Sequence, residues 1–429
     1  MRVTFYTLGC KVNQNETGAL AQLFEENGYT VVSNEEGADV YIVNSCTVTN
    51  FGDQKSRKWL RRAKRENPGA VTVLTGCYPQ AFPEEAAEIA EADVVTGSGN
   101  RHAILADVQK VLNGEEERVV DIRPHEKGEQ FEELPMDKFA EHTRAFVKVE
   151  DGCNRRCAYC VIPRARGPVR SRDEASVLEE LRRLSDAGYK EVVLTAISLP
   201  SYGIDSGTSL VELIEKAAEV PGIERIRLGS LDPDMLHDED ILRMAGVKKL
   251  CPQFHLSLQS GCDKTLRAMR RPYTTVQYAD IAAKLREAFG AENVSFTTDV
   301  IVGFPGETEV DFEASMAFVT GMQFLKVHVF PYSRREGTAA YDFPGQVPEH
   351  EKESRSRRMT AAVEEVRAAE VAAMQGRTAS VLLETPLSNT LFTGYTKQYL
   401  PVLVSAPGHK TGDIVDVTLG AWDGKRCRA

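Results

Sequence analysis

Three cysteines stand close together in the middle of the chain, within Asp151-Gly-Cys-Asn-Arg-Arg-Cys-Ala-Tyr-Cys160. Cys153, Cys157 and Cys160 have the spacing C-x-x-x-C-x-x-C and directly follow a strand-like run at 145–149. Three thiolates on such a loop can bind three irons of a [4Fe–4S] cluster and leave the fourth iron open for a substrate or cofactor. A zinc knuckle is the alternative, but zinc sites usually use C-x-x-C pairs with a fourth ligand nearby, and no further His or Cys follows closely here.

A second set of three cysteines is scattered along the N-terminal part of the chain. Cys10, Cys46 and Cys77 each follow directly after a strand-like run. Because the carboxyl ends of parallel strands share one edge of a sheet, we expect these thiols to converge on a second cluster site. The alternative is three unrelated buried cysteines. Cys251, Cys262 and Cys427 have no partner at ligand spacing and are interpreted as structural.

The hydrophobic pattern divides the chain into α/β parts that would position these cysteines. Residues 1–113 alternate strand-like runs at 3–8, 40–43, 71–74 and 94–95 with amphipathic helices, which predicts a doubly wound parallel sheet. Residues 114–140 are polar, acidic and aperiodic, which predicts a linker. Residues 141–375 contain six strand-helix units, which predict a partial (βα)6 barrel ending in a helix at 348–375. Residues 376–429 contain short alternating strands, which predict a small closed β-barrel.

Composition excludes several classes of protein. Lys and Arg total 52 and Asp and Glu total 63, so the net charge is −11, and 42% of the residues are hydrophobic. The chain can therefore bury real cores, and no apolar run is long enough to span a bilayer. The start of the sequence lacks the apolar core and cleavage site of a signal peptide, and nine cysteines do not suggest a disulfide framework. We expect a cytoplasmic protein with no membrane partner.

The cysteine loop, with Tyr159 before its last cysteine, resembles the radical S-adenosylmethionine (SAM) superfamily. With the N-terminal cysteines and the small C-terminal barrel, the chain resembles the methylthiotransferases, which join an auxiliary-cluster domain, a radical SAM core and a TRAM domain. Further matches are Arg164-Ala-Arg-Gly167, Ser257-Leu-Gln-Ser-Gly261, Gly303-Phe-Pro-Gly-Glu307 and Phe330-Pro-Tyr-Ser333. The stretch Thr195-Ala-Ile-Ser-Leu-Pro200 departs from the pattern, with Ala196 and Ser198 in place of Gly and Asn and an unusual Pro200.

This resemblance implies two [4Fe–4S] clusters and SAM as cofactors. One SAM would methylate a sulfur at the auxiliary cluster, and a second would be cleaved to a radical at the other cluster. Thr7-Leu-Gly-Cys-Lys-Val-Asn-Gln14 is similar to the branch that adds a 2-methylthio group to N6-threonylcarbamoyladenosine beside the anticodon of tRNA. The alternatives are the isopentenyladenosine branch, the branch that modifies a ribosomal-protein aspartate, and, in a different class, a non-catalytic metal-containing RNA-binding scaffold.

Other polar residues are candidate contacts for the cofactor and the RNA. Ser230, Gln259 and Asp299 follow predicted strands and are candidate SAM or substrate contacts, or ordinary polar residues of a barrel mouth. Residues 55–65 hold seven cations and no acid, and a second acid-free run of arginines surrounds the cysteine loop. These runs favour RNA binding over a solvated helix face, with Lys55, Lys58, Arg61, Arg62 and Arg65 as candidate contacts. The expected partners are a tRNA anticodon stem-loop, a flavodoxin- or ferredoxin-like electron donor and a sulfur donor.

Overall fold

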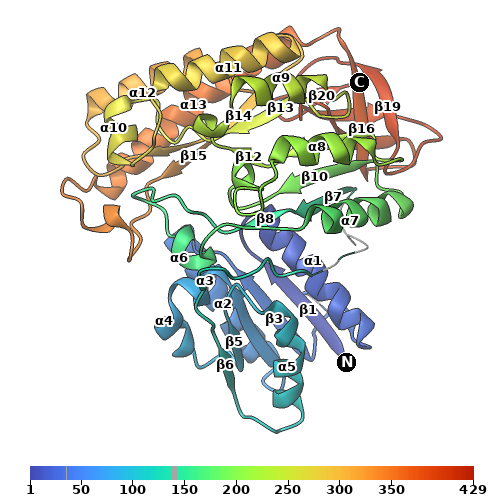
Figure 1. Cartoon of the computed structure of the whole chain (residues 1–429), viewed down its shortest axis with the longest axis vertical. Helices are drawn as coiled ribbons and strands as arrows, with labels where there is room; N and C mark the ends of the chain where they lie inside the picture. The colour runs from blue at the N-terminus through green and yellow to red at the C-terminus, as the bar shows by residue number, and fades with distance from the viewer. Residues whose placement is uncertain (35, 135, 137–142) are drawn as a thin grey trace.

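The N-terminal part folds as a six-stranded parallel sheet with the strand order β2-β1-β3-β4-β5-β6 (Figure 1). The computed structural model describes residues 1–34, 36–134, 136 and 143–429. The strands are β1 (Arg2–Thr7), β2 (Thr30–Val31), β3 (Val40–Ser45), β4 (Val71–Gly76), β5 (Val94–Thr96) and β6 (Val119–Asp121). They alternate with α1 (Lys11–Glu26), α2 (Asn50–Glu66), α3 (Cys77–Ala81), α4 (Pro83–Ala87), η1 (Arg101–Ala103) and α5 (Ile104–Leu112). The predicted doubly wound parallel sheet is confirmed.

The two edge strands of this sheet are absent from the sequence prediction. β2 and β6 are short, so neither shows a hydrophobic alternation. β6 lies within residues 114–140, the predicted linker, and pairs with β5 through Val119 and Val120. Residues 135 and 137–140 of that segment, and the predicted boundary at 140/141, lie outside the described residues.

The central part is built from six parallel strand positions, as predicted. β7 (Arg144–Lys148), β10 (Glu191–Thr195) and β11 (Arg225–Leu228) form one sheet. The other sheet contains β12 (Ser230–Leu231), β13 (Gln253–Leu256), β14 (Ser295–Val302) and β15 (Lys326–Pro331). Only Gly229 separates β11 from β12, so the two sheets continue one another as a partial barrel.

Helices surround this barrel on the outside (Figure 1). They are α7 (Glu174–Asp186), α8 (Leu210–Glu219), α9 (Asp238–Gly246), α10 (Asp263–Ala268), α11 (Thr275–Phe289), α12 (Glu309–Gly321) and α13 (Glu349–Ala373). Helix α7 shows how the sequence sets them: Asp173 caps its N-terminus, and Val177, Leu181 and Leu184 face the core. Within the described ranges, no helix combines the length and the apolar character needed to cross a membrane.

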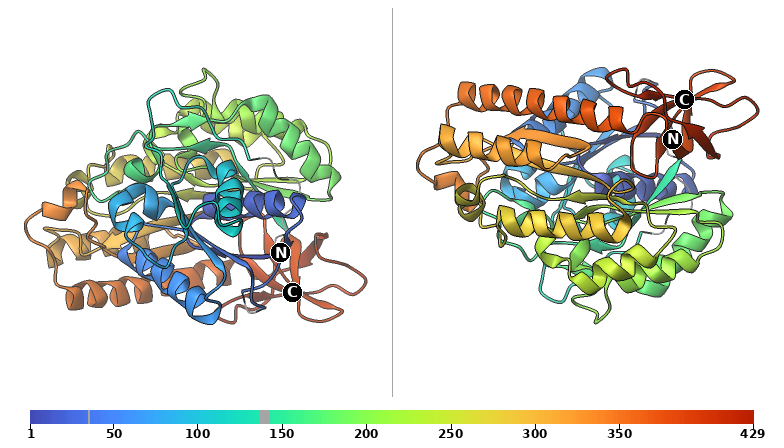
Figure 2. Two further views of the ribbon diagram at one scale, coloured as in Figure 1. Left: turned by 90° about the horizontal axis from the view of Figure 1, so that it is seen from below. Right: turned by 90° about the horizontal axis from the view of Figure 1, so that it is seen from above.

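The C-terminal part is a curled sheet in the order β19-β16-β17-β18-β20, at one end of the long helix α13 (Figure 2). Its strands are β16 (Thr378–Pro386), β17 (Leu391–Thr396), β18 (Pro401–Ser405), β19 (Ile414–Thr418) and β20 (Cys427–Arg428). The predicted closed barrel is here a half-barrel. Its last strand, β20, has two residues and joins the segment after β19 through bonds from Gly420 N to Arg428 O and from Arg428 N to Ala421 O and a bridge between Trp422 and Cys427.

Candidate active site

The three N-terminal cysteines lie at the carboxyl ends of three neighbouring strands. Cys10 follows β1 at the N-cap position of α1, Cys46 follows β3, and Cys77 is the first residue of α3 after β4. The strand order reverses between β1 and β3, and such a switch point opens a crevice at the strand ends where ligands bind. The sheet topology therefore brings together the residues that the sequence scatters.

Gly9 packs closely against Cys46 on one side of this site. Gly9, at φ +111°, is so near Cys46 that an added Cβ would lie 2.9 Å from the Cys46 Cβ. Burial raises the pKa of the Cys46 thiol to about 12, and the neighbouring Cys77 thiol adds to the rise. Burial also raises the pKa of Cys77, whose Sγ accepts a hydrogen bond from Arg166 Nε at 3.1 Å. These thiols need a strong counter-charge, such as iron, to become thiolates.

The second triad lies on the loop between β8 (Glu150–Asp151) and α6 (Ile162–Arg166). Backbone hydrogen bonds fix this loop, among them Cys153 N to Gly167 O at 3.0 Å and Ala158 N to Met269 O at 2.9 Å. Burial raises the pKa of Cys153 to about 11 and that of Cys160 to about 12. Arg271 donates from Nη1 to Cys157 Sγ at 3.4 Å and is ion-paired with Asp232. A cationic donor thus points at one sulfur of each triad.

All six thiols line a single cavity of about 460 Å³. In the described part of the chain, no three Cys, His, Asp or Glu side chains converge on a point that could hold one metal ion. A [4Fe–4S] cluster needs no such point, because each cysteine binds its own iron. Two sets of three thiols, each with a cationic donor, fit two such clusters facing one space.

The candidate SAM contacts lie around this cavity. Ser230 lines the cavity itself, and Gln259 and Asp299 line a neighbouring cavity of about 220 Å³ together with Tyr159. Gln259 has φ +71° and is held between Asp299 and Ile301 by backbone hydrogen bonds. Backbone strain of this kind at a non-glycine residue is typical of functional sites.

The unusual loop after β10 also contributes to the cavity wall. Ala196 and Ser198 line the six-thiol cavity, and Pro200 belongs to the short helix η2 (Leu199–Ser201) beside it. Ser198 N donates to Glu150 Oε2 at 2.8 Å, which ties this loop to the strand before the cysteine loop. The replacements therefore leave the loop anchored at the cavity.

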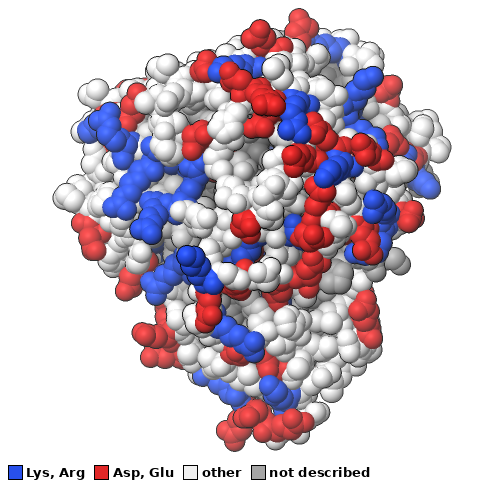
Figure 3. All heavy atoms as spheres, viewed as in Figure 1, with Lys and Arg blue, Asp and Glu red and all other residues white. Residues whose placement is uncertain are grey.

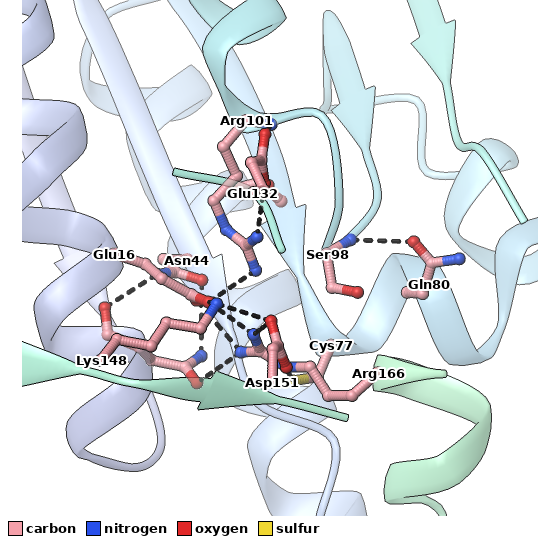
Figure 4. A network of polar contacts seen from close by, with 12 residues as sticks. Glu16, Asn44, Cys77, Gln80, Ser98, Arg101, Glu132, Lys148, Asp151 and Arg166 are labelled. Carbon is pink, nitrogen blue, oxygen red and sulfur yellow. Dashed lines mark hydrogen bonds and ion pairs between the residues drawn. The ribbon is translucent and has the colours of Figure 1, made fainter. Parts of the chain in front are cut away.

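A buried polar network holds the N-terminal sheet against the barrel (Figure 4). Glu16 of α1 forms ion pairs with Arg101 at 2.8 Å, Lys148 at 2.7 Å and Arg166 at 2.5 Å. Lys148 and Arg166 also reach Asp151, immediately before the cysteine loop. Sequence reasoning missed these residues; only the Arg164–Gly167 motif pointed to Arg166. The network fixes one cysteine site relative to the other.

Several cations of the basic run on α2 form ion pairs that the sequence did not predict. Arg61 pairs with Glu91 and Arg62 with Glu66, at 3.1 and 2.9 Å. Arg65 lies 3.9 Å from Glu66. Lys55 and Lys58 are exposed, and neither forms an ion pair with any described residue. They are therefore the candidates on this helix best placed to meet an anion.

Further exposed arginines lie near the cysteine loop. Figure 3 shows Lys and Arg side chains gathered between α10 and α6 on the face viewed. The elements in this area carry the exposed residues Arg156, Arg164, Arg267 and Arg270. Sequence reasoning missed Arg267 and Arg270, which come next to the cysteine loop only through the fold, by the bond from Ala158 to Met269.

Comparisons with known proteins agree with this geometry. Residues 147–319 match the Radical SAM superfamily, and residues 2–97 match the uncharacterized protein family UPF0004. The chain is 39% identical to the threonylcarbamoyladenosine tRNA methylthiotransferase MtaB of Bacillus subtilis, over 97% of this chain and 93% of the relative. It is 34% identical to the tRNA-2-methylthio-N(6)-dimethylallyladenosine synthase of Clostridium novyi, over 96% and 92%.

A solved structure of similar fold is the radical S-adenosylmethionine methyltransferase TsrM from Kitasatospora setae. It matches with a TM-score of 0.58 at 14% identity, over 79% of this chain and 74% of that one. This likeness supports the fold of the sheet and barrel, and the sequence relatives support the activity class. By its cysteine geometry and its full-length relatives, the chain belongs to the methylthiotransferase family of the radical SAM superfamily.

Proposed function

We propose that this protein adds a methylthio group to carbon 2 of N6-threonylcarbamoyladenosine, beside the anticodon of tRNA. The observation that carries the proposal is the single cavity lined by two sets of three cysteines. Similarity to relatives named for this reaction, including those of Bacillus subtilis and Aquifex aeolicus, supports the substrate.

The chemistry requires a cofactor, and membership of the radical SAM superfamily implies SAM with a [4Fe–4S] cluster. When bound, it supplies the radical that can break an unactivated C–H bond, which side chains cannot do. In our proposal Cys153, Cys157 and Cys160 hold this cluster, and Ser230, Gln259 and Asp299 contact SAM. Cys10, Cys46 and Cys77 would hold a second cluster, which would supply the sulfur of the methylthio group. The six-thiol cavity would hold the target base between the two sites and exclude water.

The RNA would approach the cavity along positively charged surfaces. Lys55, Lys58, Arg61, Arg62 and Arg65 remain our proposed contacts on α2, and the two lysines form no ion pair with any described residue. Val48 and Phe330 are 55% and 44% exposed and line the cavity, so they offer apolar surface to an unstacked loop base. An electron donor of flavodoxin or ferredoxin type, a sulfur donor and a cytoplasmic location complete the proposal.

The proposed domain boundaries separate the parts of the chain that would hold the two clusters from the connection and the C-terminal sheet. Residues 1–113 would form the auxiliary-cluster domain, 114–140 the connection, 141–375 the radical SAM core and 376–429 a TRAM domain. The curled sheet contacts the barrel through Arg225 and Arg227, whose guanidinium groups donate to Ser380 Oγ and Lys397 O.

Deleting the gene and digesting total tRNA to nucleosides tests the function. One nucleoside, heavier than its precursor by a methylthio group in place of hydrogen, should disappear, and N6-threonylcarbamoyladenosine should accumulate. Loss of the methylthio group from an isopentenyladenosine nucleoside or a ribosomal protein would contradict the proposed substrate but keep the chemistry. A strain with no modification missing would contradict the proposed enzyme activity.

A further inference from the structure

Lys11, the residue after Cys10, lines a second cavity of about 420 Å³. It is the first residue of α1, and its side chain is partly buried. Among the residues that the structure describes, none forms a hydrogen bond or ion pair with its ammonium group. Burial lowers the pKa of Lys11. Glu191 is the carboxylate among the groups that act on this pKa, and it is ion-paired with Arg225 and Arg227. The cavity thus contains a cation that lacks a counter-ion.

The other charges around this cavity do not neutralise Lys11. Lys326, His255 and His328 also line it, and Asp299 is the carboxylate among the lining residues. Asp299 can offset only one of the two lysine charges in the lining, Lys11 and Lys326, so the lining keeps a positive balance. A cavity with this balance favours an anionic group.

The cavity also adjoins the proposed reaction centre. Cys10, Ser230 and Phe330 line both this cavity and the six-thiol cavity. Phe330 stacks on His328 with their ring centroids 6.4 Å apart and their planes 25° apart. A base placed against Phe330 would have one edge toward the cysteines and could direct a substituent toward Lys11.

We propose that this cavity binds the threonylcarbamoyl substituent of the target adenosine and that Lys11 pairs with its carboxylate. The inference rests on the proposed function. The substituent ends in a carboxylate and a hydroxyl group, whereas an isopentenyl substituent is apolar and would leave the Lys11 ammonium unpaired. A site built around a charged partner rejects an analogue that lacks it far more strongly than a hydrophobic pocket rejects a misfit. Lys11 is therefore a specificity-determining residue.

Three anticodon stem-loops test this inference. They carry N6-threonylcarbamoyladenosine, its carboxylate methyl ester, or isopentenyladenosine, and kcat/KM is measured for the reconstituted wild type, Lys11→Gln and Lys11→Arg. The wild type should prefer the acid to the ester at least tenfold, mainly through KM. In Lys11→Gln the acid and the ester should react equally, and Lys11→Arg should restore much of the preference. Lys248→Gln, an exposed lysine after α9, is the matched control and should behave as the wild type.

The outcomes separate the inference from the proposed function. A wild type inactive on the threonylcarbamoyl stem-loop contradicts the proposed function. A wild type that reacts with acid and ester equally overturns the role of the carboxylate, whatever the variants do. A Lys11→Gln variant that retains the full preference for the acid overturns the role of Lys11. Iron content and SAM cleavage without RNA, measured for every variant, should match the wild type, because Lys11 is assigned to the substrate alone.

Discussion

Arg166 donates a hydrogen bond from Nε to Cys77 Sγ across 3.1 Å, although 89 positions separate the two residues in the chain. The same guanidinium group binds Glu16 and Asp151. Arg166 ends α6, the helix that follows the loop with Cys153, Cys157 and Cys160. One side chain therefore connects the two cysteine sites.

Replacing Arg166 with Gln should make the reduction potential of the auxiliary cluster more negative. Hydrogen bonds to cluster sulfur stabilise the reduced, more negatively charged state, and the variant loses a charged donor. A redox titration followed by electron paramagnetic resonance measures both clusters, and the radical SAM cluster should change less. Arg164→Gln, on the exposed face of the same helix, is the control. Unchanged potentials for both clusters in Arg166→Gln would contradict this role.

Glu16 is the common partner of three buried cations, so its charge should stabilise the contact between the N-terminal sheet and the barrel. Glu16→Gln leaves Arg101, Lys148 and Arg166 short of one buried negative charge. Breaking a buried ion network in this way costs about 3–5 kcal/mol. Urea unfolding of the two proteins measures the difference. A loss below about 1 kcal/mol, the value typical of a surface pair, would contradict the network's role.

The ionisation of Glu16 should make the stability of the protein depend on pH. Burial alone would raise the pKa of Glu16, but the charges of Arg101, Arg166 and Lys148 outweigh it and lower the pKa from 4.5 to about 2. A group whose pKa is lowered by folding stabilises the protein at a pH above its pKa in the unfolded state. This stabilisation is lost as the pH falls through its pKa in the folded state. The Tm of the apoprotein should therefore fall more steeply between about pH 4.5 and 2 in the wild type than in Glu16→Gln. Equal slopes would show that Glu16 is not held ionised.

Gly9 should be required for the auxiliary site. In Gly9→Ala the new Cβ would lie 2.9 Å from the Cys46 Cβ and 3.2 Å from its Sγ, in a backbone conformation that already disfavours alanine. The reconstituted variant should keep the radical SAM cluster and lose the auxiliary iron. Gly28→Ala is a matched control, because Gly28 also has a positive φ but nothing lies within 4 Å of its added Cβ. If Gly9→Ala binds as much iron as Gly28→Ala, the packing around Cys46 is not critical.

The α2 lysines should contribute more to tRNA binding than the paired arginines. Changing Lys55 and Lys58 to Gln should flatten the plot of log affinity against log salt by about 0.7–0.9 per lost phosphate contact. Changing Arg61 and Arg62 to Gln should alter the slope less, since Glu91 and Glu66 already bind them. Binding of an anticodon stem-loop at several salt concentrations measures both. If the lysine variant keeps the wild-type slope of log affinity against log salt, α2 is a solvated helix that does not contact the RNA.

The sequence predicts this molecule well where information is local or topological. Cys153, Cys157 and Cys160 follow from spacing, and the convergence of Cys10, Cys46 and Cys77 follows from the shared edge of parallel strands. The cation in each cysteine site could not be predicted this way, because Arg166 and Arg271 reach the sulfurs from other elements. Likewise, the acids that neutralise much of α2 come from outside the basic run: Glu85 and Glu91 for Arg57 and Arg61, and Asp93 for Lys64.

The iron content of cysteine variants tests most directly the central claim, that two separate clusters face one cavity. Anaerobically reconstituted protein should bind about eight irons, and either triple replacement, of Cys10, Cys46 and Cys77 or of Cys153, Cys157 and Cys160 by Ala, should leave about four. Replacing Cys251, Cys262 and Cys427 together is the matched control and should leave about eight. A wild type with only four irons, or either cluster variant with the full count, would contradict the claim.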